Sequence, residues 1–161
     1  MNFLKKIFWP FIKAFINTIS PNYLNKFKIS FLNILINFGF SNSLNRMDRQ
    51  IINFFNQKKS GSFLEIGAAD GIDQSNSFLL ERKYNWSGYL VEPVKSQYES
   101  CKKYRKNSLV ERLIVTSPEI HKNNKTFPIK VNSLRSQVSK YNPSSEKKFE
   151  EFVETITLDG F

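Results

Sequence analysis

Cysteine and histidine are almost absent from this chain. Its 161 residues include one cysteine, Cys101, and one histidine, His121. A single cysteine cannot form an intrachain disulfide, which favours a reducing compartment and a cytoplasmic protein. A zinc or iron site needs several histidine, cysteine or acidic ligands close together, and the sequence has no such cluster. We therefore expect no metal centre, and we interpret Cys101 as a small buried apolar residue rather than a nucleophile.

Acidic residues are scarce in the first part of the chain. Residues 1–60 hold nine lysines and arginines but only one acid, Asp48, whereas residues 61–161 hold fifteen basic and thirteen acidic residues. The net charge of +10 therefore belongs mostly to the leading segment. The nearly neutral second part argues against a nucleic-acid groove. We divide the chain accordingly into a basic helical segment, 1–60, and a domain, 61–161.

The leading segment lacks a long uninterrupted apolar run. Apolar residues recur at helical spacing over residues 3–19 and again over residues 23–40, and a third helix is expected over residues 44–55. Lysines and Pro10 interrupt the first run, which argues against a membrane-spanning helix. No small-residue cleavage site follows it, which argues against a secretory signal. The amphipathic helices of residues 1–40 either make peripheral contact with a membrane surface or pack on the protein's own core.

The region from Ser62 to Glu92 has the order of a nucleotide-binding βαβ unit. A short apolar run breaks into a glycine-bounded loop, a helix start follows, and a second apolar run ends on an acid; these parts are Ser62–Ile66, Gly67–Gly71, Phe78 onward, Gly88–Val91 and Glu92. The loop does not contain the G-x-G-x-x-G pattern of dinucleotide enzymes. The order of elements, rather than the glycines alone, carries the prediction.

The chemistry of this unit favours a cationic adenosyl ligand. Glycine allows a sharp turn and close approach of a ligand to the backbone, and the helix that follows points unpaired N–H groups at it. An acid at the end of the second strand, here Glu92, is placed to accept hydrogen bonds from ribose hydroxyls. Glu65 and Asp70 disfavour a diphosphate and suit an amine and a sulfonium. These features point to S-adenosylmethionine.

Three segments resemble FkbM-type methyltransferases. The run FLEIGAADGIDQSNS at residues 63–77 resembles the first motif of that family, and YNWSGYLVEP at residues 84–93 resembles its next block. A later segment, VETITLD at residues 153–159, is similar to a third block. The resemblance implies an S-adenosylmethionine-dependent enzyme that methylates a hydroxyl oxygen on a sugar, glycan or secondary metabolite.

Carried over residue by residue, the resemblance implies seven cofactor-binding positions. These are Glu65, Gly67, Asp70, Gly71, Ser75, Asn76 and Glu92. A hydroxyl acceptor usually needs a general base, and the sequence identifies none. His121 lies in a polar run and is interpreted as a solvated residue of a surface loop.

The family also has a later acidic block that residues 1–161 do not contain. We therefore expect an α/β fold with a partial Rossmann-like sheet, made of the first three parallel strands plus edge strands and preceded by amphipathic helices. One edge of Ser62–Ile66 should lack a neighbouring strand. Such a truncated form should bind the cofactor weakly and lack a complete active site.

The remaining elements are predicted from local pattern. We expect a helix over residues 95–106, a strand over 109–116, an edge strand over 127–132, a polar loop over 132–148 and a strand over 152–158. Two other functions stay open. One is a membrane-surface interaction protein with a degenerate nucleotide-binding scaffold, and the other is a nucleotide or dinucleotide binder.

Overall fold

The computed structural model describes residues 30–32, 34–37, 40–130, 137–138 and 151–161. Contacts divide the chain into two compact units, residues 1–40 and residues 41–161. In the first unit, residues 30–32 and 34–37 are helical, with Leu32, Leu35 and Ile36 buried. The helix predicted over residues 23–40 is confirmed over this part. The helix predicted over residues 3–19 lies outside the described residues.

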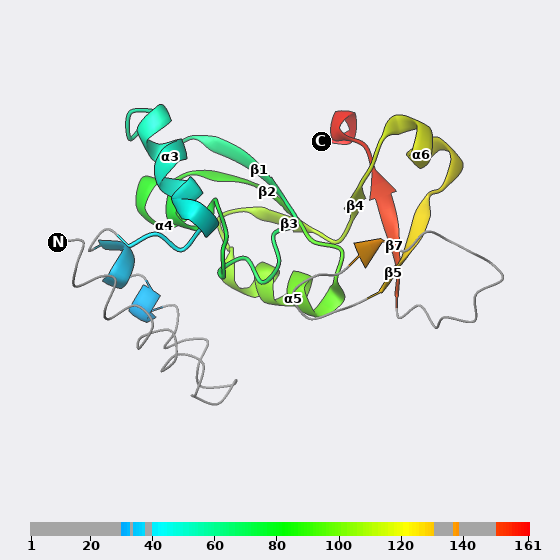
Figure 1. Ribbon diagram of the computed structural model, residues 1–161, viewed down its shortest axis with the longest axis horizontal. Helices are drawn as coiled ribbons and strands as arrows, with labels where there is room; N and C mark the ends of the chain where they lie inside the picture. The colour runs from blue at the N-terminus through cyan, green and yellow to red at the C-terminus, as the bar shows by residue number, and fades with distance from the viewer. Residues whose placement is uncertain (1–29, 33, 38–39, 131–136, 139–150) are drawn as a thin grey trace. The chain divides into compact units, whose positions relative to one another are not determined.

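A parallel three-stranded sheet opens the second unit. Its strands β1 (Ser62–Ile66), β2 (Ser87–Val91) and β3 (Leu109–Glu111) lie in the order β1-β2-β3. Parallel neighbours need a crossover, and helices α4 (Phe78–Tyr84) and α5 (Lys95–Tyr104) provide it (Figure 1). The predicted α/β class and the three parallel strands are therefore confirmed. Among the described strands, β1 lies at one edge of this sheet.

One face of this sheet is packed and the other is open. Leu90 and Val110 point into a core with Ala68 and Cys101, against which Phe63 and Tyr98 also pack. On the other face, apolar side chains remain 42–57% exposed; they are Leu64, Ile66, Tyr89 and Leu109. The ring of Phe161 stands edge-on to Tyr89 with 6.0 Å between ring centroids. Parallel sheets are usually covered on both faces, so this exposed apolar face is unusual.

Cys101 lies in that core, as the sequence predicts, and it should be chemically inert. Burial raises the pKa of its thiol from 9.0 to about 12, although the nearby charge of Arg105 lowers it. At pH 8 the thiolate population should therefore be about a thousandfold smaller than in an unfolded chain. We expect iodoacetamide to label Cys101 at least about a hundredfold more slowly in the native protein than in urea. Equal labelling rates, read by mass spectrometry, would contradict the buried assignment.

A short helical segment precedes the sheet. The 3-10 turn η1 (Leu44–Arg46) leads into helix α3 (Met47–Phe54), where one regular helix was predicted over residues 44–55. The difference arises at Asn45 and Arg46, which both have left-handed backbone angles. Asp48 is fully buried and accepts hydrogen bonds from Ser41 Oγ and from the backbone N–H of Asn42. The chain entering α3 is therefore held by a buried carboxylate.

The predicted strand over residues 109–116 is wrong as a single element. After β3 the chain leaves the first sheet, and β4 (Ile114–Val115) pairs with β7 (Glu151–Ile156) in a second sheet. Arg112 lies at the break, where its Nε donates to Pro93 O at 3.2 Å and its Nη2 pairs with Glu151. The apolar pattern continues through this point, so the sequence gives no signal of a break. The strand ends here because Arg112 contacts residues that are distant in sequence.

The second sheet has the order β4-β7-β5-β6, with β5 at Thr126–Lys130 and β6 at Gln137–Val138. Helix α6 (Pro118–Asn123) lies between β4 and β5, and the 3-10 turn η2 (Leu158–Gly160) follows β7. The prediction of β5 as an edge strand is wrong, because β6 adds beyond it. The physical argument for that prediction, that proline avoids positions paired on both sides, still holds at Pro128. Strand β6 pairs only with residues 129 and 130, so Pro128 has a neighbouring strand, β7, on one side only. Most of the predicted polar loop lies outside the described residues.

Candidate functional site

The Gly67–Gly71 turn and Glu92 meet at the carboxyl ends of β1 and β2. The N–H of Gly67 and that of the next residue both donate to Val91 O, at 2.8 and 3.0 Å. The N–H of Ala69 donates to Glu92 Oε2 at 2.8 Å, across 23 residues of sequence. The turn is therefore closed onto the acid that ends the neighbouring strand.

Glu92 is held by two backbone donors in a buried position. Its Oε1 accepts the N–H of Val94 at 2.9 Å, and Oε2 accepts that of Ala69. The residue is 6% exposed, and this burial raises the pKa of its carboxyl above the ordinary 4.5, while the two N–H groups lower it. A carboxylate has about four lone-pair sites. Glu92 therefore keeps acceptor capacity beyond these two bonds.

The two glycines of the turn have different surroundings. Both have left-handed backbone angles, φ +76° at Gly67 and +77° at Gly71. A Cβ at Gly67 would meet nothing within 4 Å, whereas a Cβ at Gly71 would lie 2.7 Å from Cys101 Sγ and 2.8 Å from Arg105 Cγ. Ala69, with φ 49°, also adopts the left-handed region, at a cost of about 1–2 kcal/mol. Gly67 thus faces open space, and Gly71 faces α5.

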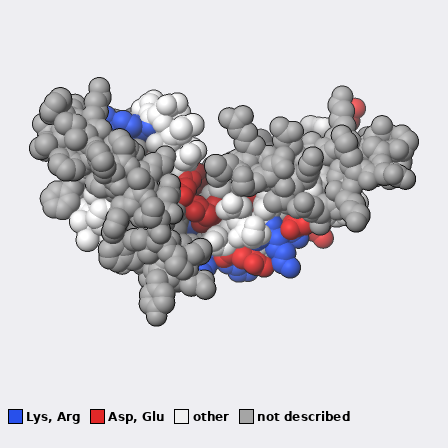
Figure 2. Space-filling view, turned by 60° about the horizontal axis from the view of Figure 1, so that its bottom comes forward, with Lys and Arg blue, Asp and Glu red and all other residues white. Residues whose placement is uncertain are grey.

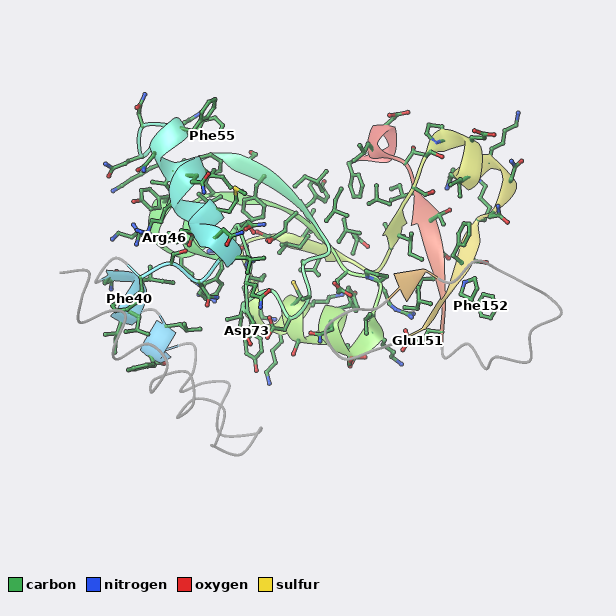
Figure 3. The ribbon with its side chains drawn as sticks, viewed as in Figure 1. Phe40, Arg46, Phe55, Asp73, Glu151 and Phe152 are labelled. Atoms are coloured by element: carbon green, nitrogen blue, oxygen red, sulfur yellow. The ribbon has the colours of Figure 1, made fainter. Side chains whose placement is uncertain are left out.

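Asp70 shapes the turn through one of its two carboxylate oxygens. Its Oδ1 accepts the N–H groups of Ile72 and Asp73 at 2.9 and 2.8 Å, which closes a local Asx turn. Within the described part of the chain, Oδ2 receives no hydrogen bond. Asp70 is half-buried and Asp73 is exposed on the loop before α4 (Figure 3). Acidic atoms also form part of the molecular surface in the turned view (Figure 2).

Glu65, Ser75 and Asn76 are brought together, with their polar groups joined to one another. Glu65 Oε1 accepts the backbone N–H of Asn76 at 2.8 Å. Its Oε2 accepts a hydrogen bond from Ser75 Oγ at 2.9 Å and another from Ser77 Oγ. Ser75 Oγ in turn accepts the N–H of Phe78, so Ser75 rather than Ser77 caps the start of α4. These residues build the wall behind the turn.

Arg105 completes that wall, and the sequence gives no sign of it. It follows α5 directly, is fully buried, and donates to residues of the loop and of α4. A basic residue at the end of a helix usually interacts with the helix dipole at the surface. Only the three-dimensional structure shows that this arginine turns inward.

His121 is not the solvated loop residue that was predicted. It lies on α6, half-buried, with Nδ1 2.8 Å from Thr155 Oγ1 and Nε2 2.8 Å from Lys125 Nζ. Thr155 Oγ1 donates to Asn124 O at 2.9 Å, so it accepts the proton of His121 Nδ1. Thr155 lies on β7, so His121 makes a structural contact with the second sheet.

A hollow of about 380 Å³ lies at the opposite end of the strands from the turn. Its lining comes from the amino ends of the strands and from the loop before β3, namely Ser62, Phe63, Ser87, Gly88, Tyr89 and Lys106 to Leu109. None of the seven predicted residues lines it. Ligands of parallel α/β sheets bind outside the carboxyl ends of the strands, so the turn remains the better candidate.

The described residues offer neither a cluster of metal ligands nor a membrane-spanning helix. No group of three or more histidine, cysteine or acidic side chains there is placed to hold a metal ion. No helix in the same ranges is long and apolar enough to cross a membrane. No family model, curated protein or solved structure matches this chain.

Proposed function

We propose that the chain is an S-adenosylmethionine-dependent methyltransferase of the FkbM type that acts on a hydroxyl group of a small molecule or glycan. The observation that supports the proposal most is the 2.8 Å hydrogen bond from Ala69 N–H to Glu92. It joins the glycine turn of β1 to the terminal acid of β2, where an adenosyl ligand would need both. The motif resemblance in residues 63–77 and 84–93 supplies the reaction class.

The residues at the turn fit this cofactor. Glu92 has lone pairs left to accept ribose hydroxyls, and Asp70 Oδ2 can accept a bond from the ammonium of the methionine part. The position where Gly67 lacks a side chain is open, which allows a ligand to approach the backbone. Two carboxylates at one turn would repel a diphosphate. The site therefore suits a cationic adenosyl ligand better than a dinucleotide.

The cofactor carries the activated methyl group, so the protein's task is to bind and orient. An in-line displacement at the methyl carbon depends on holding the acceptor oxygen in position. The turn and the Glu92 carboxylate would fix the adenosyl part, and the hydrogen bonds of Glu65 would hold the loop behind them. No residue is assigned as the base that takes the hydroxyl proton, because Asp70 and Glu92 are both assigned to the cofactor.

Calorimetric titration of the full chain with S-adenosylmethionine tests the proposal. We expect Glu92→Ala to weaken binding at least about tenfold, because hydrogen bonds to a charged acceptor contribute ~1.5–3 kcal/mol each. Glu111→Ala is the matched control: Glu111 ends β3 at the same edge of the sheet, and its side chain is exposed. It removes the same charge and should change affinity less than about twofold.

Two outcomes would overturn this assignment. Indistinguishable heats for the wild-type chain and Glu92→Ala would remove the ribose contact. Stronger thermal stabilisation by a dinucleotide than by S-adenosylmethionine would instead favour a phosphate-binding site.

A further inference from the structure

Arg105 is a buried charge placed between two aromatic rings. Its guanidinium carbon lies 5.5 Å from the ring centroid of Phe63 on β1 and 5.8 Å from that of Phe78 on α4. The side chain has no solvent exposure. A buried guanidinium is costly unless its donors are satisfied and its charge is balanced. The hydrogen-bond acceptors of Arg105 therefore indicate which segments the residue holds together.

All three nitrogens of the guanidinium donate hydrogen bonds, two of them to the loop between β1 and α4 and one to α4 itself. Nη1 donates to Gly71 O at 3.0 Å and Ser75 Oγ at 3.1 Å, Nη2 to Ser77 Oγ at 2.8 Å, and Nε to Glu81 Oε2 at 2.9 Å. Three of these four acceptors belong to the loop between β1 and α4. The planar, rigid fork of arginine suits such divergent contacts, which a lysine cannot reproduce.

The charge of Arg105 is balanced from both sides. Glu81 on α4 forms an ion pair at 2.9 Å, and Glu65 on β1 lies at 3.8 Å. Glu65 is also the residue that accepts hydrogen bonds from the Ser75–Ser77 segment. Strand, loop and helix thus share one buried network centred on Arg105.

We propose that Arg105 is a positioning residue for the adenosyl site. It fastens the far end of the loop, Gly71 to Ser77, so that the near end presents Gly67 and Asp70 to the ligand. Glu65 and Ser75 then serve as anchors of this loop rather than as ligand contacts. The inference rests on the proposed cofactor, but the fastening itself has a readout that needs no ligand.

The experiment compares Arg105→Lys with Glu81→Gln in the full chain. Arg105→Lys keeps the positive charge and loses the fork. Glu81→Gln disturbs the same buried pair without touching the loop: Oε2 takes the bonds from Arg105 and Ser108, while Oε1 has no partner among described residues. A glutamine oxygen in the Oε2 position can therefore keep both bonds. The two variants separate loss of the loop contacts from loss of the ion pair.

Amide hydrogen exchange gives the first readout. In Arg105→Lys, we expect the N–H groups of Asn76 and Phe78, which are bonded to Glu65 and Ser75, to exchange at least about tenfold faster. Their rates in Glu81→Gln should rise by less than about threefold. Equal acceleration in both variants would mean a general loss of stability and would overturn the positioning role.

Titration with S-adenosylmethionine gives the second readout. Arg105→Lys should bind at least about tenfold more weakly than Glu81→Gln, a difference of ~1.4 kcal/mol. If Arg105→Lys does not fold, Ser77→Ala, which removes one loop acceptor and leaves the arginine in place, should show the same two changes at smaller size. Faster loop exchange with unchanged affinity would overturn the link to the ligand. No binding of S-adenosylmethionine by the wild-type chain would overturn the proposed function. The amide hydrogen exchange rates would still test whether Arg105 holds the loop in place.

Discussion

Gly71→Ala should destabilise the unit of residues 41–161 by about 3–5 kcal/mol, whereas Gly67→Ala should cost only about 1–2 kcal/mol. The two glycines have nearly the same left-handed φ, so the backbone cost of an added Cβ is nearly equal and cancels in the comparison. The difference is steric. At position 71 the new carbon would lie under 3 Å from Cys101 Sγ and Arg105 Cγ, and at position 67 it would meet nothing.

Urea unfolding followed by tryptophan fluorescence measures both variants against the wild type. Gly67→Ala, the less destabilised variant, should nevertheless lose affinity for S-adenosylmethionine while it remains folded. The reason is that its new methyl group lies where the ligand is proposed to approach. Equal destabilisation by the two substitutions would mean that Gly71 does not pack tightly on α5. Unchanged affinity in Gly67→Ala would count against the open position as the ligand's approach.

The sequence predicted the βαβ unit because its signals are local. The apolar runs of β1 and β2, the loop between them and the start of α4 can each be recognised within a few residues, and parallel topology then requires Glu92 to end beside the turn. A short apolar run between turn residues is typical of a buried parallel strand. The predicted bounds of β1, Ser62–Ile66, are confirmed for this reason.

Other features depend on contacts between distant residues. The strand predicted over residues 109–116 is divided because Arg112 pairs with Glu151, 39 residues further along the chain. Arg105 joins Gly71, 34 residues before it, and no motif announces that contact. Gly71 illustrates the limit best: the pattern predicts a glycine beside the ligand, and it gives no sign of the helix packed behind that glycine.

Arg105→Met should have the second large effect, a loss of about 3–5 kcal/mol in the free energy of unfolding. The methionine fills most of the space between the two aromatic rings, so little of the loss comes from a cavity. The cost arises because the carboxyl group of Glu81, whose side chain is 1% exposed, is left buried without its cationic partner. The loop acceptors also lose their donor.

A double substitution separates these two contributions. Glu81→Met combined with Arg105→Met removes both buried charges, and breaking an ion pair at one partner usually costs more than replacing the whole pair by apolar residues. We therefore expect the double variant to be more stable in urea than Arg105→Met alone, by at least about 1 kcal/mol. Glu65 limits the recovery, because it still accepts bonds from the Ser75–Ser77 segment but has lost its nearby positive charge. A double variant less stable than Arg105→Met would show that hydrogen bonds of Glu81 such as the one from Ser108, rather than an uncompensated charge, determine the stability of this core.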